Sequence, residues 1–268
     1  RILTGTLDGI EQTTGGKTLA TVSFRGFRIA IPIREMLVLD ERMPSGRAYA
    51  DYMNRLNRIL GTMLGAEIDF IVKGIDSTTH SAVASRREAM LRKRQTFYLG
   101  KDVSGNPYIY PGRLVEARVI AVAEKVLRVE AFGIECAIFA RDLSWQWVSD
   151  VRDLYSVGDR VLIRVQEISG KDAEHLSIRA DIRSTFSETS VDNLKKCQVQ
   201  SKYAGKVTDL RGGVVYIRLN NGVNAIAHTC YDSRMPGKKD DVSFAVTRLD
   251  EEHGIAVGII TRIIKRNL

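Results

Sequence analysis

A ring and a cation stand two residues apart on one predicted strand near the end of the chain. Val215, Ile217 and Leu219 form the apolar set of this strand, so Tyr216 and Arg218 point to its other face. A tyrosine ring on such a face can stack on another planar group, and a guanidinium beside it can neutralise an anion. The chemistry open to this pair is stacking and charge neutralisation, and no bond need be made or broken.

Residue patterns typical of catalysis are missing from the sequence. It contains no His-Glu-x-x-His, no P-loop, no dinucleotide glycine pattern and no nucleophile elbow, and its carboxylates scatter over predicted turns. The three cysteines, Cys136, Cys197 and Cys230, lack the Cys-x-x-Cys spacing of a zinc site and are odd in number for a disulfide framework. We therefore predict a protein that is not an enzyme, with reduced cysteines, no metal and no cofactor.

The elements that position Tyr216 and Arg218 recur along the chain. Three segments, 26–36, 133–143 and 222–230, each begin with a glycine and continue as an alternating apolar strand that ends in a polar loop. Each segment has two predicted strands before it and two after it. Five short strands in about 70 residues predict a small closed barrel. The alternative is one large β-sandwich whose parts resemble each other by accident.

This repeat predicts an all-β protein of three tandem five-stranded barrels over 1–98, 111–183 and 201–268. The first barrel carries an insertion over 45–62 whose apolar residues recur at helical spacing, which predicts an amphipathic helix. We expect its apolar stripe to plug the barrel, the alternative being a surface for a partner. Residues 85–94 then form a basic segment, which is either a solvated helix flank or a track for a nucleic-acid backbone.

The charge of the chain is +8, and it is unevenly distributed. Residues 1–98 carry a net charge of +5 and residues 201–268 a net charge of +4, whereas residues 111–183 carry −1. A basic surface attracts phosphate backbones by counterion release, so the outer units suit that role better than the middle unit. No apolar run approaches the ~20 residues that span a bilayer. We expect a cytoplasmic protein with no membrane partner.

The middle unit resembles the S1 RNA-binding domain, the repeated OB-fold module of bacterial ribosomal protein S1. The resemblance rests on the strand start, the Gly-Asp turn and the closing Ser-x-Arg, at Gly133, Glu135, Ile138, Phe139, Asp142, Leu143, Gly158, Asp159, Val161, Ser177 and Arg179. The first and last units match the same pattern at fewer positions, so they resemble divergent copies. The resemblance implies three OB-fold barrels that bind single-stranded RNA through aromatic and basic residues on one face.

Carried over position by position, the resemblance implies an RNA-contacting set in each unit. In the last unit the set is Tyr216, Arg218 and His228, where His228 ends the third strand. In the middle unit Phe139 takes the position of His228, with Arg128 and Arg141 nearby. The first unit offers Lys17 and Arg28, and the basic segment adds Arg86 and Arg87.

Trp145 and Trp147 stand in a loop of the middle unit. We expect them to pack against a barrel or a neighbouring domain, the alternative being that they stack on bases. As a whole, the sequence predicts a non-catalytic, single-stranded RNA-binding protein of ribosomal protein S1 type that acts in translation or RNA handling. The alternative is an OB-fold assembly subunit with little RNA binding. The neutral middle domain is then the surface for the ribosome or another protein.

Overall fold

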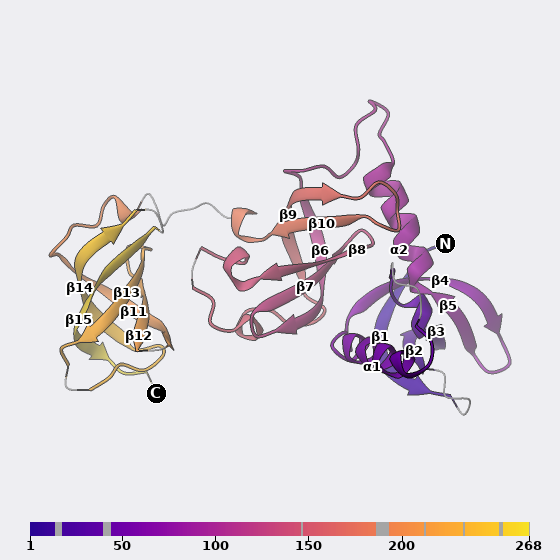
Figure 1. The fold of residues 1–268 in the computed structure, drawn as a ribbon, viewed down its shortest axis with the longest axis horizontal. Coiled ribbons are helices and arrows are strands. Elements are labelled where there is room, and N and C mark those ends of the chain that lie inside the picture. Colours follow the sequence, from indigo (N-terminus) through magenta and orange to yellow (C-terminus); the bar gives the residue numbers. More distant parts are fainter. Residues whose placement is uncertain are drawn as a thin grey trace. The chain divides into compact units, whose positions relative to one another are not determined.

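The computed structural model describes residues 1–13, 18–39, 44–145, 147–185, 193–211, 213–232, 234–251 and 254–267. Within these ranges the chain is mostly strand, in three separate five-stranded sheets, as predicted (Figure 1). The single β-sandwich is thereby excluded. The strands are β1 (Leu3–Gln12), β2 (Thr18–Phe24), β3 (Phe27–Pro32), β4 (Glu67–Asp76), β5 (Ser81–Ser85), β6 (Leu114–Ala123), β7 (Val126–Ala131), β8 (Ile134–Phe139), β9 (Arg160–Ser169), β10 (Ser177–Asp181), β11 (Lys202–Arg211), β12 (Val214–Leu219), β13 (Asn224–Cys230), β14 (Asp241–Asp250) and β15 (Ile255–Lys265).

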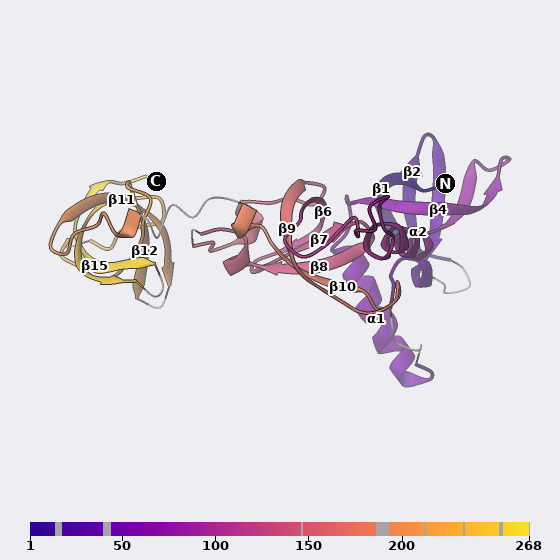
Figure 2. The same ribbon diagram turned by 90° about the horizontal axis from the view of Figure 1, so that it is seen from above.

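All three sheets have the same strand order. The first closes as β1-β2-β3-β5-β4 and the third as β11-β12-β13-β15-β14, each through a parallel pair, β3 with β5 and β13 with β15. Figure 2 shows the closed ring of the third barrel. The middle sheet runs β10-β9-β6-β7-β8, with β8 and β10 at its edges and no backbone ladder between them. It is therefore a nearly closed barrel, which refines the prediction of three closed ones.

The glycines that open each repeat have a common geometric role. Gly26, Gly133 and Gly222 all have positive φ, between 84° and 89°. Gly26 and Gly133 follow residues that also have positive φ, which is the conformation that a tight two-residue hairpin requires. A side chain on Gly133 would also lie only 2.3 Å from the carbonyl oxygen of Met90. Because this turn conformation favours glycine, each repeat begins with a glycine that can be recognised in the sequence.

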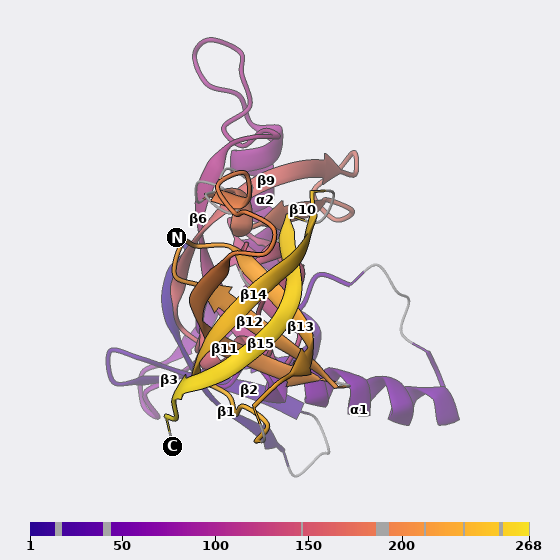
Figure 3. The same cartoon turned by 90° about the vertical axis from the view of Figure 1, so that its left-hand side faces the viewer.

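Two helices accompany the barrels, α1 (Arg47–Gly61) and α2 (Arg86–Arg94). Helix α1 is the predicted insertion and is visible beside the first barrel in Figure 3. Its residues Leu56 and Leu60 are fully buried in the core of the first barrel, so its apolar stripe is core, as expected. Shorter helical turns are η1 (Ile33–Glu35), η2 (Gln95–Leu99), η3 (Ala140–Asp142), η4 (Val151–Asp153) and η5 (Arg183–Thr185).

Helix α2 continues directly from β5. The side-chain oxygen of Ser85 accepts a hydrogen bond from the backbone N–H of Glu88 at 3.0 Å, which caps the helix and places a carboxylate in its first turn. Arg92, Lys93 and Arg94 lie in its last turn, where positive charge is favoured. The basic segment of the sequence is therefore a well-formed helix.

The chain divides into two compact units. The first holds Arg1–Phe139 and Asp150–Thr185, and thus both of the first two barrels and both α-helices. Ile120 of β6 belongs to the same buried cluster as the core of the first barrel, so these two barrels share apolar packing. The second unit holds Ala140–Ser149 and the described part of Phe186–Leu268.

No helix in the described ranges is long and apolar enough to cross a membrane.

Candidate nucleic-acid interface

The middle barrel presents an outward face on β7 and β8. The backbone register sets Val126 opposite Phe139, Arg128 opposite Ala137, and Glu130 opposite Glu135. The family resemblance assigns RNA contact to this face. Its three cross-strand pairs differ in chemistry: one is apolar, one carries a cation, and one carries two carboxylates.

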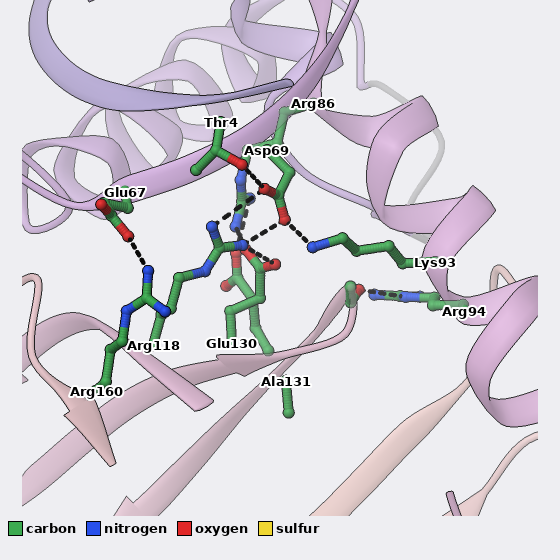
Figure 4. Close-up of polar contacts among 12 residues, drawn as sticks. Thr4, Glu67, Asp69, Arg86, Lys93, Arg94, Arg118, Glu130, Ala131 and Arg160 are labelled. Carbon is green, nitrogen blue, oxygen red and sulfur yellow. Dashed lines mark hydrogen bonds and ion pairs between the residues drawn. The ribbon is translucent and has the colours of Figure 1, made fainter. Parts of the chain in front are cut away.

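Helix α2 occupies the acidic end of this face (Figure 4). The Arg86 side chain is 0% exposed, and its guanidinium donates to Glu130 at 2.7 Å and to Glu135 at 2.8 Å. It also donates to the backbone carbonyl of Met36 at 2.7 Å. Burial disfavours the charged guanidinium, but the two carboxylates outweigh it and raise the pKa of Arg86. This corrects the assignment of Arg86 to an RNA-contacting surface, because a buried guanidinium that is paired with two carboxylates cannot reach a phosphate.

A second ion cluster joins the same elements around Asp69 of β4. Asp69 accepts hydrogen bonds from Lys93 of α2 and from Arg118 of β6, and from the Thr4 hydroxyl at 2.6 Å. Arg118 also donates to Glu130 at 2.9 Å, which links this cluster to Arg86 (Figure 4). Burial raises the pKa of Asp69, but the hydrogen bonds and charge of Arg118 and Lys93 outweigh it and lower the pKa to about 2.

The far end of α2 is also held by the middle barrel. Arg94 donates to the backbone carbonyl of Gly133 at 2.6 Å and to that of Ala173 at 3.0 Å. Arg87, about two turns before Arg94 on α2, pairs with Glu174 at 2.8 Å. The cations of the basic segment thus bind the protein's own carboxylates and carbonyls, and the solvated-flank interpretation holds for only part of the helix.

The other residues of the first compact unit for which RNA contact was predicted differ in how far their side chains are paired or exposed. Arg128 faces outward but is bound to Glu135, and Arg28 pairs with Glu11 on its own barrel. Phe139 is 51% exposed at the other end of the β7–β8 face, opposite Val126. Lys17 lies outside the described residues. In the second unit, the Arg141 side chain is exposed and lies 3.5 Å from Asp142.

The third barrel presents the corresponding face on β12 and β13. Val215, Ile217 and Leu219 are buried, and Tyr216 and Arg218 alternate with them on the outside, as the strand pattern predicts. Tyr216 lies opposite Ile226 and Arg218 opposite Asn224, whose side-chain oxygen accepts from Arg218 at 3.0 Å. His228 is exposed further along β13. The structure therefore brings Tyr216, Arg218 and His228 onto one face.

A hollow of about 390 Å³ borders this face, and it is lined by cations without a carboxylate. Its lining residues are Lys206, Val207, Thr208, Arg218, Leu219, Asn220, Lys238 and Lys239. Partial burial lowers the pKa of Arg218. Our reading of the sequence missed all three lysines. The sequence signal for this hollow is the pair Lys238-Lys239 in the turn before β14. Charged turns are common on protein surfaces, so the pair does not stand out in the sequence.

The loop over 140–149 belongs to the same compact unit and lies against this face. The rings of Trp147 and Tyr216 stack at 4.4 Å between centroids, with 11° between their planes. The Trp147 indole N–H donates to Asp209 at 3.1 Å, and the Lys238 ammonium donates to the Ser149 hydroxyl at 3.1 Å. Trp147 thus packs on a barrel, as expected, although 43% of it remains exposed.

Among the residues that the structure describes, no three His, Cys, Asp or Glu side chains gather as a metal site. Cys136 and Cys197 are buried, and burial raises the pKa of the Cys136 thiol to about 12.

Comparison with known proteins identifies a family to which the middle barrel is similar. Residues 109–179 match the family model of the S1 RNA binding domain. The chain is 23% identical over 217 residues to small ribosomal subunit protein bS1 of Coxiella burnetii, covering 77% of this chain and 38% of that protein. It is 21% identical over 219 residues to 4-hydroxy-3-methylbut-2-enyl diphosphate reductase of Clostridium acetobutylicum, covering 81% of this chain and 30% of that protein. The chain therefore spans only about a third of the length of these relatives.

Among solved structures, a chain of the a/eIF2alpha–aDim2p–rRNA complex of Pyrococcus horikoshii is 18% identical. It matches with a TM-score of 0.27 and covers 33% of this chain and 56% of its own length. The family match falls on β6 to β10, the sheet whose strand order and Gly133 turn were described above. The resemblance expected from the sequence is thereby confirmed for the middle barrel, which matches the S1 RNA-binding domain over residues 109–179.

Proposed function

We propose that this chain binds single-stranded RNA without catalysing a reaction on it, as a protein of ribosomal protein S1 type acting in translation or RNA handling. One observation carries the proposal. The outer face of β12 and β13 sets an aromatic stack and an exposed histidine beside a hollow lined by four cations. Rings stack on bases, and cations neutralise the phosphates between them.

This face suits single strands better than duplexes. Base stacking on Tyr216, or on the Trp147 ring stacked against it, needs an unpaired base, which a duplex does not offer. Neither stacking nor phosphate neutralisation reads sequence closely, so the preference is for unstructured RNA of broad sequence. The family match to an RNA-binding domain and the similarity to bS1 support the same ligand class. The proposal places the protein in the cytoplasm.

The test is fluorescence polarisation of the full chain with a labelled, unstructured RNA at about 50 mM and 200 mM salt. Each phosphate contact adds about −0.7 to the slope of log affinity against log salt for a single strand. Lys238→Ala with Lys239→Ala should weaken binding and make that slope shallower by one to two contacts. Arg152→Ala is the matched control, because Arg152 is an exposed arginine that pairs with its neighbour Asp150.

The proposal fails if the chain does not bind this RNA even at the lower salt. It also fails if removing both lysines changes affinity no more than Arg152→Ala does. Non-catalysis is checked in the same samples, because the RNA should migrate unchanged on a denaturing gel after prolonged incubation with the protein.

A second candidate is a protein-interaction or assembly subunit, and one observation favours it. The β7–β8 face of the middle barrel already binds a protein element, since it holds α2 through Arg86. A ribosomal or other protein partner of the middle domain would have to use surface that α2 does not cover. Absence of RNA binding at low salt, together with a stable protein complex, would favour this candidate.

A further inference from the structure

Trp147 is the most exposed part of the aromatic stack on the third barrel. One face of its indole lies on Tyr216, while its N–H is bonded to the Asp209 carboxylate. The segments beside it are also attached: the Asn224 side chain donates to the backbone carbonyl of Trp145, and Lys238 donates to Ser149. The indole is thus held by Tyr216 on one ring face and by Asp209 at its N–H, and 43% of the residue remains exposed to solvent.

This arrangement decides where a base can stack. A base that stacks on Tyr216 must first remove Trp147, which breaks one ring stack and a hydrogen bond to a charged group. The new stack would only replace the lost one, so little affinity is gained. A base that stacks on the part of the Trp147 indole that remains exposed, 43% of the residue, need break neither of these contacts, and it meets a ring that is already ordered.

We infer that Trp147, and not Tyr216, supplies the surface on which an RNA base stacks, while Tyr216 is a positioning residue that holds the indole. The phosphate next to that base enters the hollow of Lys206, Arg218, Lys238 and Lys239. This hollow is continuous with the stack through Arg218, two residues from Tyr216 on the same face of β12, and through Lys238, which binds the loop that carries Trp147. The inference rests on the proposed function and names the residue that contacts the base.

The first experiment compares RNA affinity among variants of the full chain. Trp147→Ala should weaken binding roughly 5- to 100-fold, which is the range for losing one base–aromatic stack. Trp147→Phe keeps a ring on Tyr216 but loses the bond to Asp209, so it should weaken binding less. Tyr216→Leu keeps an apolar seat for the indole and should also cost less than Trp147→Ala. Tyr49→Ala removes a ring of similar exposure, 40%, from α1 in the other unit and should leave affinity unchanged.

The second experiment follows the indole itself. The sequence has two tryptophans, so Trp145→Phe leaves Trp147 as the single tryptophan, whose emission can be excited selectively over that of the tyrosines. Stacking of a base on Trp147 should quench its emission, with a midpoint that equals the affinity from polarisation, and Tyr216→Leu should preserve the quenching. A shift of the emission to the red would show instead that RNA drives Trp147 off Tyr216 into water.

The outcomes separate this inference from the proposed function. If the unaltered chain does not bind RNA, the proposed function fails. If it binds with salt dependence while Trp147→Ala binds as well or more tightly, only the inference fails, and Trp147 is then a cover over Tyr216. Weaker binding by Trp147→Ala with quenching of the single indole supports the inference.

Discussion

The outer faces of the middle and third barrels correspond pair by pair, yet the two are used in opposite ways. The pair Glu130–Glu135 on β7 and β8 stands where Arg218–Asn224 stands on β12 and β13. In the middle barrel this pair receives the buried guanidinium of Arg86. In the third barrel it borders an open hollow of cations.

The difference shows how a repeated fold acquires separate tasks. Two carboxylates on the outward face of a strand pair repel phosphate and attract a cation, and α2 supplies that cation from within the same chain. Exchanging them for an arginine and an amide leaves the backbone unchanged but reverses the sign of the ligand that fits. The first two barrels are thereby joined, while the face of the third barrel borders a hollow lined by cations.

The substitution with the largest expected effect is Arg86→Ala, which removes the ion pairs that set the middle barrel apart from the third. It leaves the buried Glu130 with Arg118 alone and Glu135 with Arg128 alone, and removing one partner of a buried ion pair costs about 3–5 kcal/mol. The free energy of unfolding of the first unit, measured by urea denaturation, should fall by that amount. Arg87→Ala removes only the more exposed pair with Glu174 and should cost under about 1 kcal/mol. Equal effects of the two variants would contradict the structural role of Arg86.

The next effect is a loss of stability in acid that depends on Asp69. Its pKa in the folded protein, about 2, lies below the ordinary 3.8, so its stabilising contribution is present above pH ~4. The contribution is lost as the pH falls from there towards 2, and it amounts to about 2 kcal/mol. Asp69→Asn should therefore lower stability at pH 7 and flatten its decline between pH 5 and 2, as followed by urea denaturation at several pH values. An unchanged slope in Asp69→Asn would show that other carboxylates govern the acid limb.

Arg218→Glu sharpens the comparison by giving the third barrel the acidic character of the middle one. We expect RNA affinity at 50 mM salt to fall about tenfold, or about 1.4 kcal/mol, because one phosphate contact is lost and a like charge replaces it. The salt slope should also become shallower. Arg152→Glu is the control of equal charge change, and a similar loss in that variant would assign the effect to net charge alone.

The smallest effect is expected for Arg128→Ala, the counterpart of Tyr216 on the middle barrel. Its guanidinium is already bound to Glu135, so its loss should change RNA affinity less than about twofold in the polarisation assay. A loss as large as that from Arg218→Glu would mean that the middle barrel face contributes directly to RNA binding.

Much of the fold could be predicted because the relevant signals are local. Positive φ at Gly26 and Gly133 belongs to a two-residue turn, and the burial of Val215, Ile217 and Leu219 follows from strand alternation within six residues. The apolar stripe of α1 likewise follows from helical spacing. Each of these signals involves neighbours in sequence, so no knowledge of the fold is needed to read it.

The site was harder to predict, because the state of a cation depends on partners distant in sequence. Arg86 lies 44 and 49 residues from its two carboxylates, and Trp147 lies 62 residues from Asp209. Five cationic residues in a short segment look equally available for RNA in the sequence. The structure shows that Arg86, Lys93 and Arg94 are all engaged by the protein itself.

The sequence alone determined the strands, the hairpin turns and which side chains of each strand face outward, since the period of two and the glycine turns act over a few residues. Only the tertiary structure decided which outward-facing charges are neutralised and which remain open to a ligand. The physical reason is that electrostatic pairing acts through space, so the availability of an arginine is set by the carboxylates that folding brings beside it.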